Sequence, residues 1–165
     1  MDTVSNELQI GKAGEHLVCF DLIRQGYNAF LSDQGLPYDV IVDVGGFPKR
    51  IQVKTTQKTI SYEKAIGVYR FGLCRGRGNR GRFALANGSV DGFAFVALDI
   101  MKIAYLTVDE VTSTNASIRH IKQTMDFKTR SIQYPAPKSK NSWGTGYRDR
   151  RGFIEDFSNF DRILK

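Results

Sequence analysis

Apolar residues recur at helical intervals near the start of the chain. Ala13, Leu17, Phe20 and Ile23 are separated by four, three and three positions. This spacing places the four side chains on one face of a helix. It predicts a helix over residues 11–26 whose apolar face packs on the core. Gly26 suits the left-handed residue that commonly ends a helix.

Two later segments alternate apolar and polar side chains, which is typical of half-buried strands. Residues 38–44 place three valines on one face, and residues 49–55 alternate in the same way. Gly45 and Gly46 lie between the two segments, and paired glycines are typical of a tight reversal. The pattern therefore predicts a β-hairpin.

The pattern of apolar residues weakens toward the C-terminus. Further strands are expected at residues 27–31, 69–74, 92–98 and 103–108, with a turn at 99–102 and a short helix beginning at 108. Residues 114–134 alternate poorly, and residues 135–151 are polar and rich in turn residues. A terminal helix is expected at the end, because Phe153, Phe157, Phe160 and Leu164 recur at intervals of four, three and four.

Length and composition indicate one soluble domain. The chain has 165 residues, of which 41% are hydrophobic and 25% charged, and these values exclude a disordered chain. Cys19 and Cys74 are far apart in the sequence, so two reduced, buried thiols in a reducing compartment are expected. The N-terminus is too polar for a signal peptide, and no apolar run approaches the ~18 residues of a membrane span. We therefore expect a cytoplasmic protein without membrane contact.

Charge is unevenly distributed along the chain, whose net charge is +7. Residues 1–46 hold seven acidic and two basic residues, whereas residues 47–87 hold ten basic residues and one acidic residue. Residues 114–165 form a second basic block, with eleven basic and five acidic residues. Such segregation favours nucleic acid as a partner over a merely basic, solvated surface.

Polar residues with metal-binding chemistry accompany the predicted hairpin. Asp39 starts the first strand, and Gln52 and Lys54 share one face of the second strand, within diagonal reach of Asp39. Glu15 lies in the first turn of the preceding helix, where a carboxylate is stabilised. Carboxylate and amide oxygens suit Mg²⁺, and a lysine can orient the attacking water and stabilise charge on the phosphorane. An ordinary surface arrangement is the alternative to a divalent-metal site that hydrolyses phosphodiester bonds.

The same residues carry a family resemblance. Pro37-Tyr38-Asp39, followed after 12 residues by Gln52-Val53-Lys54, resembles the signature of the PD-(D/E)XK nuclease superfamily. The segment from Gly11 to Glu15 resembles the start of that superfamily's first helix. Residues 51–56 are most similar to a branch that includes a cyanobacterial group I intron homing endonuclease, in which glutamine also replaces the usual second acid. The resemblance covers about residues 8–112.

The resemblance implies an α/β fold with a mixed central β-sheet flanked by helices. Residues 1–112 would form the nuclease core, and residues 113–165 an extension packed on it, for DNA binding or oligomerisation, within a single domain. The implied catalytic residues are Glu15, Asp39, Gln52 and Lys54. Glu15, Asp39 and Gln52 would hold Mg²⁺, for which Mn²⁺ can substitute, and double-stranded DNA would be the substrate.

Several basic residues are candidates for DNA contact. Lys49, Arg50 and Lys58 flank the predicted site. A glycine-rich loop contributes Arg75, Arg77, Arg80 and Arg82, and a C-terminal segment contributes Arg148, Arg150 and Arg151. The loop is interpreted as a clamp on the phosphate backbone, with a disordered basic loop as the alternative. The C-terminal arginines are equally consistent with groove binding and with solvation.

Three functions remain open at this point. The first is a Mg²⁺-dependent homing-type endonuclease with sequence preference, and the second is a Holliday junction resolvase. The third is a DNA-binding module that has lost catalysis through Gln52. Because one active site cuts one strand, double-strand cleavage implies a homodimer or homotetramer. The apolar stripe of the terminal helix is either its interface or a surface that docks on its own domain.

Overall fold

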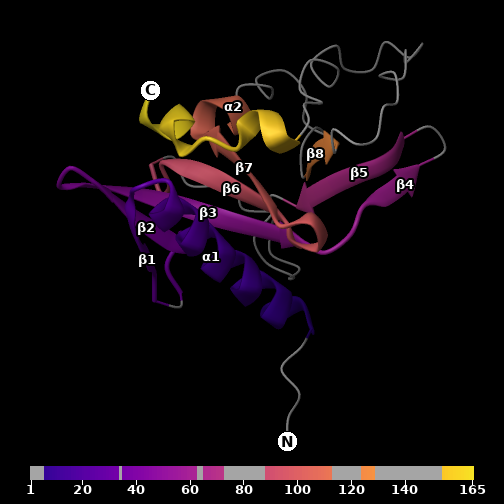
Figure 1. Ribbon diagram of the computed structural model, residues 1–165, viewed down its shortest axis with the longest axis horizontal. Coiled ribbons are helices and arrows are strands. Elements are labelled where there is room, and N and C mark those ends of the chain that lie inside the picture. Colours follow the sequence, from indigo (N-terminus) through magenta and orange to yellow (C-terminus); the bar gives the residue numbers. More distant parts are fainter. Residues whose placement is uncertain (1–5, 34, 63–64, 73–87, 113–123, 129–153) are drawn as a thin grey trace, which may run out of the picture.

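The computed structural model describes residues 6–33, 35–62, 65–72, 88–112, 124–128 and 154–165. Its centre is a five-stranded sheet in the order β1-β2-β3-β6-β7, with helix α1 packed along it (Figure 1). The pairing of β3 with β6 is parallel, and the other pairings in this sheet are antiparallel. The sheet is therefore mixed and is flanked by helices, as the resemblance implied.

Helix α1 spans Asn6–Arg24, so it begins five residues earlier than expected. Its buried residues are Gly14, Val18 and Leu22, which recur every four positions. The expected apolar stripe is wrong, since Phe20 is 63% exposed and Ile23 is 59% exposed. The reason is Gly14, which contributes no apolar side chain to the pattern and yet is buried against the Thr55 side chain of the sheet.

The predicted hairpin is confirmed. Strands β2 (Val40–Val44) and β3 (Phe47–Thr56) pair antiparallel, and β1 (Asn28–Leu31) pairs with the outer side of β2. Gly45 and Gly46 have φ of 60° and 88°. Positive φ at both central residues is the requirement of a tight hairpin turn that matches strand twist. The glycine pair therefore sets the register that aligns Val40 with Ile51.

Strand β6 (Gly92–Ala97) lies between β3 and β7, and all six of its residues are buried. It continues through the turn η1 (Leu98–Ile100) into β7 (Lys102–Thr107) and the short helix α2 (Val108–Thr112), close to the expected bounds. Asp91 stabilises the start of the parallel pairing between β3 and β6. Its carboxylate accepts hydrogen bonds from the backbone N–H of Arg50 and from the Arg50 guanidinium at 2.8–3.2 Å.

A second, three-stranded sheet covers the other face of the central sheet. It consists of β4 (Ile60–Tyr62), β5 (Ala65–Gly72) and β8 (Thr124–Lys128), in that order. Phe71 of β5 packs on Phe95 of β6, with ring centroids 5.2 Å apart. The expected strand at residues 69–74 thus overlaps β5 at residues 69–72, and residues 73–74 lie outside the described residues. Strands β4 and β8 were not predicted, because they are short and alternate weakly.

The C-terminal segment is not the single helix that was expected. It forms two short 3-10 helices, η3 (Ile154–Phe157) and η4 (Phe160–Leu164), and the side chain of Asn159 caps the second by accepting the N–H of Asp161. Asparagine favours such capping over helix interiors, which explains the break. Figure 1 shows this segment beside α2.

Phe160 docks on its own chain. Its ring is fully buried and meets Tyr27 and Tyr105 edge to face, with centroids 4.9 and 5.4 Å away. Phe157 is partly buried and lies under the guanidinium of Arg162. For Phe160, the interpretation of the stripe as a surface for its own domain therefore holds. Phe153 lies outside the described residues.

We expect Gly14→Ala to destabilise the protein. A Cβ at this position would lie 1.9 Å from the Thr55 hydroxyl and 2.9 Å from Thr55 Cβ, so α1 would have to move off the sheet. The expected loss in the free energy of unfolding is about 1–3 kcal/mol, measured by urea denaturation. Gly11→Ala is the control on the same helix. Its Cβ meets nothing within 4 Å, so the substitution should stabilise by about 0.5–1 kcal/mol. Equal effects of the two substitutions would contradict the close approach.

The Arg50–Asp91 pair predicts part of the stability at neutral pH. The Arg50 guanidinium, by hydrogen bonding, holds the pKa of the Asp91 carboxyl below its usual range. Such a carboxylate contributes stability above its unfolded pKa and loses that contribution as pH falls through its folded pKa. Asp91→Asn should therefore cost about 1–2 kcal/mol at pH 7 and progressively less in acid. Urea unfolding across this range tests it, and a loss that persists unchanged in acid would rule the ion pair out as the cause.

Candidate active site

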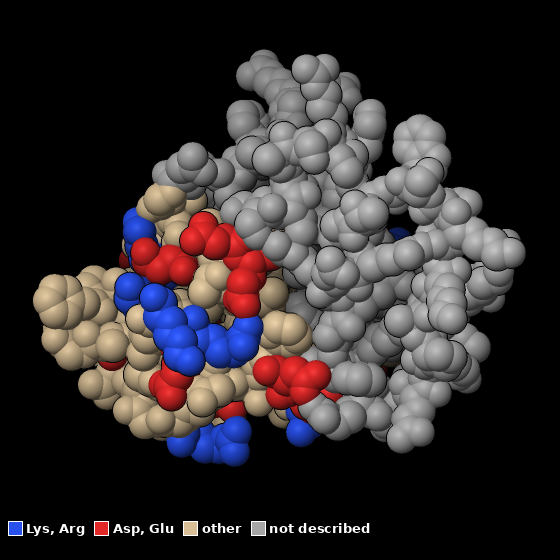
Figure 2. Space-filling model, turned by 90° about the horizontal axis from the view of Figure 1, so that it is seen from above, with Lys and Arg blue, Asp and Glu red and all other residues tan. Residues whose placement is uncertain are grey.

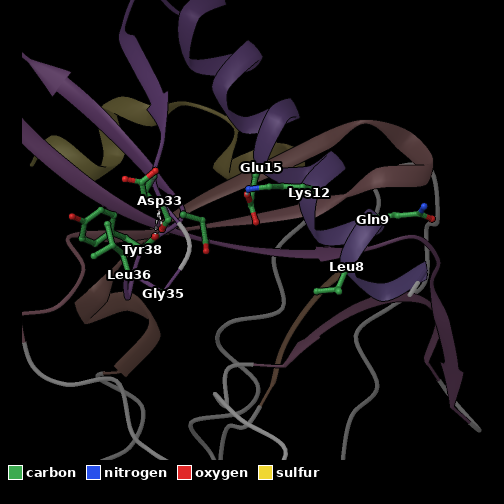
Figure 3. A pocket seen from close by; sticks show the side chains of 10 residues that line it. Leu8, Gln9, Lys12, Glu15, Asp33, Gly35, Leu36 and Tyr38 are labelled. Carbon is green, nitrogen blue, oxygen red and sulfur yellow. Dashed lines mark hydrogen bonds and ion pairs between the residues drawn. The ribbon is translucent and has the colours of Figure 1, made fainter. Parts of the chain in front are cut away.

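A pocket of about 450 Å³ lies between α1 and the segment that links β1 to β2. Lys12 and Glu15 reach it from α1, and Asp33, Leu36, Tyr38 and Asp39 line it from the linking segment (Figure 3). Two of the predicted catalytic residues, Glu15 and Asp39, thus border one pocket. They come from opposite walls and are separated by 24 positions in the sequence.

Asp39 is held rigidly at the start of β2. Its backbone N–H donates to the carbonyl of Ile51 at 2.9 Å, and its carbonyl accepts the N–H of Ser32 at 3.0 Å. The Ser32 hydroxyl donates to the Tyr38 carbonyl at 2.6 Å and fastens the linking segment from its other side. The carboxylate itself accepts the backbone N–H of Val53 at 2.7 Å, a short, charge-assisted bond. Asp39 therefore sits against the stretch of β3 that carries Gln52 and Lys54.

Gln52 is almost fully enclosed, with 2% of its surface exposed. Its amide NH₂ donates to the carbonyl of Pro37 at 3.4 Å. In the reverse orientation the Gln52 amide oxygen would face the Pro37 carbonyl oxygen, and both are acceptors. The Pro37 carbonyl therefore fixes which way the amide faces. The Gln52 Oε1 atom is then buried and makes no hydrogen bond with any residue that the structure describes. A buried acceptor without a partner costs about 1–3 kcal/mol, so this oxygen suits a ligand.

Lys54 lies on the same strand face as Gln52 and is half-buried. In the parallel register Gln52 pairs with Phe93 and Lys54 with Phe95, so this face belongs to the side that the small sheet covers. Helix α1 packs on the opposite face, which carries Ile51 and Val53. Glu15 thus lies on one side of the sheet and the Gln-x-Lys pair on the other. Asp39, just before β2, borders the pocket of Glu15 and is bonded to Val53, between Gln52 and Lys54.

Lys12 is a site residue that the sequence reasoning missed. Its ammonium lies 2.7 Å from Glu15 Oε2. The hydrogen bond and charge of Glu15 raise the pKa of Lys12 above its usual value, and the charge of Asp39 acts in the same direction. The available signal was the spacing, because residues three apart on a helix are neighbours.

The predicted DNA-contact residues are placed only in part. Arg50 is paired with Asp91, Lys49 is half-buried and Lys58 is exposed. The seven arginines of the glycine-rich loop and the C-terminal segment lie outside the described residues: Arg75, Arg77, Arg80, Arg82, Arg148, Arg150 and Arg151. Figure 2 shows that acidic and basic side chains of the described residues interleave on the face seen there. Their roles in DNA contact stay predictions.

The donor set fits a hard divalent cation. Within the described part of the chain, no three His, Cys, Asp or Glu residues cluster as a metal centre. The candidate site instead combines two carboxylates, from Glu15 and Asp39, with the amide oxygen of Gln52. Such oxygen ligands are those that Mg²⁺ prefers, and the ion usually keeps several waters as well.

This fold, with an aspartate ahead of β2 and a Gln-x-Lys pair on β3, defines a PD-(D/E)XK nuclease core. The sequence model of the PD-(D/E)XK endonuclease family matches residues 5–137, and the chain belongs to this family. The protein is therefore a nuclease.

Comparison with solved structures supports the fold. The chain resembles the bacterial homing endonuclease I-Ssp6803I with a TM-score of 0.60. The similarity covers 88% of this chain and 89% of that one, at 18% sequence identity. At this identity the likeness shows the fold alone. No curated protein matches the sequence. Among the described helices, none is long and apolar enough to cross a membrane.

The enclosure of Gln52 predicts how an acid at this position would behave. Gln52→Glu would bury a carboxylate next to the Pro37 carbonyl, and burial raises a carboxyl pKa. Stability is then retained below the unfolded pKa of the carboxyl and is lost as pH rises from there through the raised folded pKa. We expect a loss of about 2–4 kcal/mol at pH 7 in EDTA, a smaller loss near pH 5, and partial recovery with Mg²⁺. Urea unfolding measures all three.

Gln52→Met is the matched control for this prediction. It keeps the side-chain volume and removes the buried acceptor together with its NH₂, so it should be nearly neutral or stabilising. A strong loss of stability in Gln52→Met would mean that Oε1 already has a partner in the protein.

Proposed function

We propose that this nuclease is a Mg²⁺-dependent DNA endonuclease whose site consists of Glu15, Asp39, Gln52 and Lys54. The observation that carries the proposal is the buried Gln52 Oε1, which lacks a partner among the described residues and lies on the strand that anchors Asp39. Family membership supports phosphodiester hydrolysis as the reaction.

The residues divide the work by their chemistry. Glu15, Asp39 and Gln52 would hold the ion, with Mn²⁺ able to replace Mg²⁺. When bound, such an ion supplies a Lewis acid for the phosphate and lowers the pKa of water. Lys54 holds the attacking water and stabilises negative charge on the phosphate oxygens as the bond to the leaving oxygen breaks. The bond from Val53 to Asp39 keeps the aspartate from turning away.

Nucleic acid is the substrate that the charge distribution favours, and the family resemblance favours double-stranded DNA. The block of ten basic residues between positions 47 and 87 includes Lys54 and follows the acidic N-terminal third of the chain. A small phosphate ester would need no such block, whereas a polyanionic backbone gains from it. The structural likeness to a bacterial homing endonuclease supports a sequence-specific target. Cutting both strands of such a target requires a homodimer or homotetramer.

Plasmid cleavage tests this function directly. Wild-type protein should convert supercoiled plasmid to nicked or linear forms with Mg²⁺ and not with EDTA. Lys54→Ala and Asp39→Asn should each lower the rate at least about a hundredfold, because each removes a group that acts on the reacting phosphate or its ion. Gel analysis of time courses gives the rates.

Lys102→Ala serves as the control, because Lys102 is an exposed lysine on the edge strand β7 and does not border the pocket. Its rate should equal that of the wild type. Equal cleavage by wild type and Lys54→Ala would refute the site assignment. Binding of DNA without cleavage under every metal condition would favour the module that has lost catalysis through Gln52.

A further inference from the structure

Lys12 and Glu15 form an ion pair inside the candidate active site. They lie three residues apart on α1, with 2.7 Å between the ammonium and the carboxylate. Both line the pocket that Asp39 borders from the other side, and Figure 3 shows them together on the helix wall. The Lys12 side chain is 46% exposed and that of Glu15 only 19%. Lys12 can therefore leave the pair by rotating about its long stem, whereas Glu15 stays at the pocket.

The charges around the pocket are unbalanced. Three carboxylates border it, from Glu15, Asp33 and Asp39. Lys12 is the one cation among the described residues that line it. Without Lys12, every charged side chain that lines this pocket among the described residues would be a carboxylate. Carboxylates repel a phosphate within the same pocket, and the repulsion is stronger where the protein excludes water.

Glu15 cannot satisfy two cations equally. A divalent ion held by Glu15 would repel an ammonium at 2.7 Å from the same carboxylate. Such an ion would have twice the charge of the ammonium and, unlike it, would also be held by Asp39 and Gln52. Lys12 would then turn toward the open side of the pocket, where the backbone of bound DNA would lie.

We propose that Lys12 exchanges partners during the nuclease cycle, pairing with Glu15 before the metal binds and with a phosphate of the bound DNA strand afterwards. This proposal rests on the proposed function of the site. Lys12 is then a substrate-binding residue whose pairing with Glu15 opposes metal binding in the absence of DNA. Loss of its charge should change the two affinities in opposite directions.

Helix α1 supplies a matched control for this exchange. Arg24 pairs with Asp21 across the same three-residue spacing at 2.8 Å. Its side chain is 68% exposed, and neither residue lines the pocket of Glu15 and Asp39. Lys12→Gln and Arg24→Gln therefore remove the same charge from equivalent pairs on one helix. Glutamine is also a good helix former, so α1 should remain intact.

The first measurement is Mn²⁺ binding by isothermal titration without DNA. Lys12→Gln should bind Mn²⁺ about three- to tenfold more tightly than wild type, because the competing cation is gone. Arg24→Gln should bind as wild type does. Lys12→Arg, which keeps the charge, should also bind as wild type does.

The second measurement is DNA affinity with Mg²⁺ present. Both substitutions are made in a Lys54→Ala background, which keeps the DNA intact, and binding of a labelled mixed-sequence duplex is followed by fluorescence anisotropy. Lys12→Gln should weaken binding about three- to tenfold and lower the slope of log Kd against log salt by about one, the signature of one lost phosphate contact. Arg24→Gln should leave the slope unchanged.

The outcomes separate the two proposals. If wild type binds Mn²⁺ and Lys12→Gln binds it no more tightly, the exchange of partners is wrong and the metal site stands. If Lys12→Gln leaves the salt dependence of DNA binding unchanged, the phosphate contact is wrong. If wild-type protein binds no divalent ion with or without DNA, the proposed function fails and the exchange fails with it.

Discussion

The close approach of helix α1 to strand β3 at Gly14 is the constraint on which the site depends. The Thr55 side chain lies directly against Gly14 there, and even a methyl group on Gly14 would overlap it. The next residue along the helix is Glu15, so the same contact brings a carboxylate to the pocket's edge. The next turn of the helix buries Val18 and the one after it Leu22, both at 0% exposure. Packing and catalytic geometry thus share one face of α1.

The site lies at the end of the sheet because its groups come from both sheet faces. Gln52 and Lys54 lie on the face covered by the small sheet, whereas Glu15 lies on the helix that covers the other face. Asp39 lies one residue before β2 begins. Its carboxylate accepts the backbone N–H of Val53, which lies between Gln52 and Lys54 on β3. The backbone of Gln52 is fixed because β3 pairs with β2 on one side and with β6 on the other. This pairing keeps the buried amide oxygen of Gln52 in place although it has no hydrogen-bond partner among the described residues.

Sequence patterns predicted the hairpin well and the helix face poorly, for physical reasons. Alternation and a glycine turn are local signals, and both strands of the hairpin obeyed them. The buried face of α1 depends on Gly14, a residue that hydrophobic spacing cannot register. The pairing of Arg50 with Asp91 joins residues 41 positions apart, so no local pattern in the sequence predicts it. The prediction of a single C-terminal helix was wrong at Asn159. The side chain of Asn159 caps the second 3-10 helix by a hydrogen bond, although the apolar spacing continues across it.

The four candidate site residues could be proposed without the structure because each is of a type that metal-dependent phosphodiester hydrolysis requires. Lys12 could not, since a lysine three residues from a glutamate is ordinary on any helix. Arg24 and Asp21 form a similar pair at another pocket, one that neither Glu15 nor Asp39 lines. Lys12 differs because it lines the same pocket as Asp33 and Asp39, and only the folded chain brings these residues together. A nuclease must place acids where a polyanion is to bind. Those acids repel the phosphates of the substrate. In the candidate site, Lys12 on α1 and Lys54 on β3 offset this repulsion, while most of the chain's basic residues lie elsewhere in the sequence.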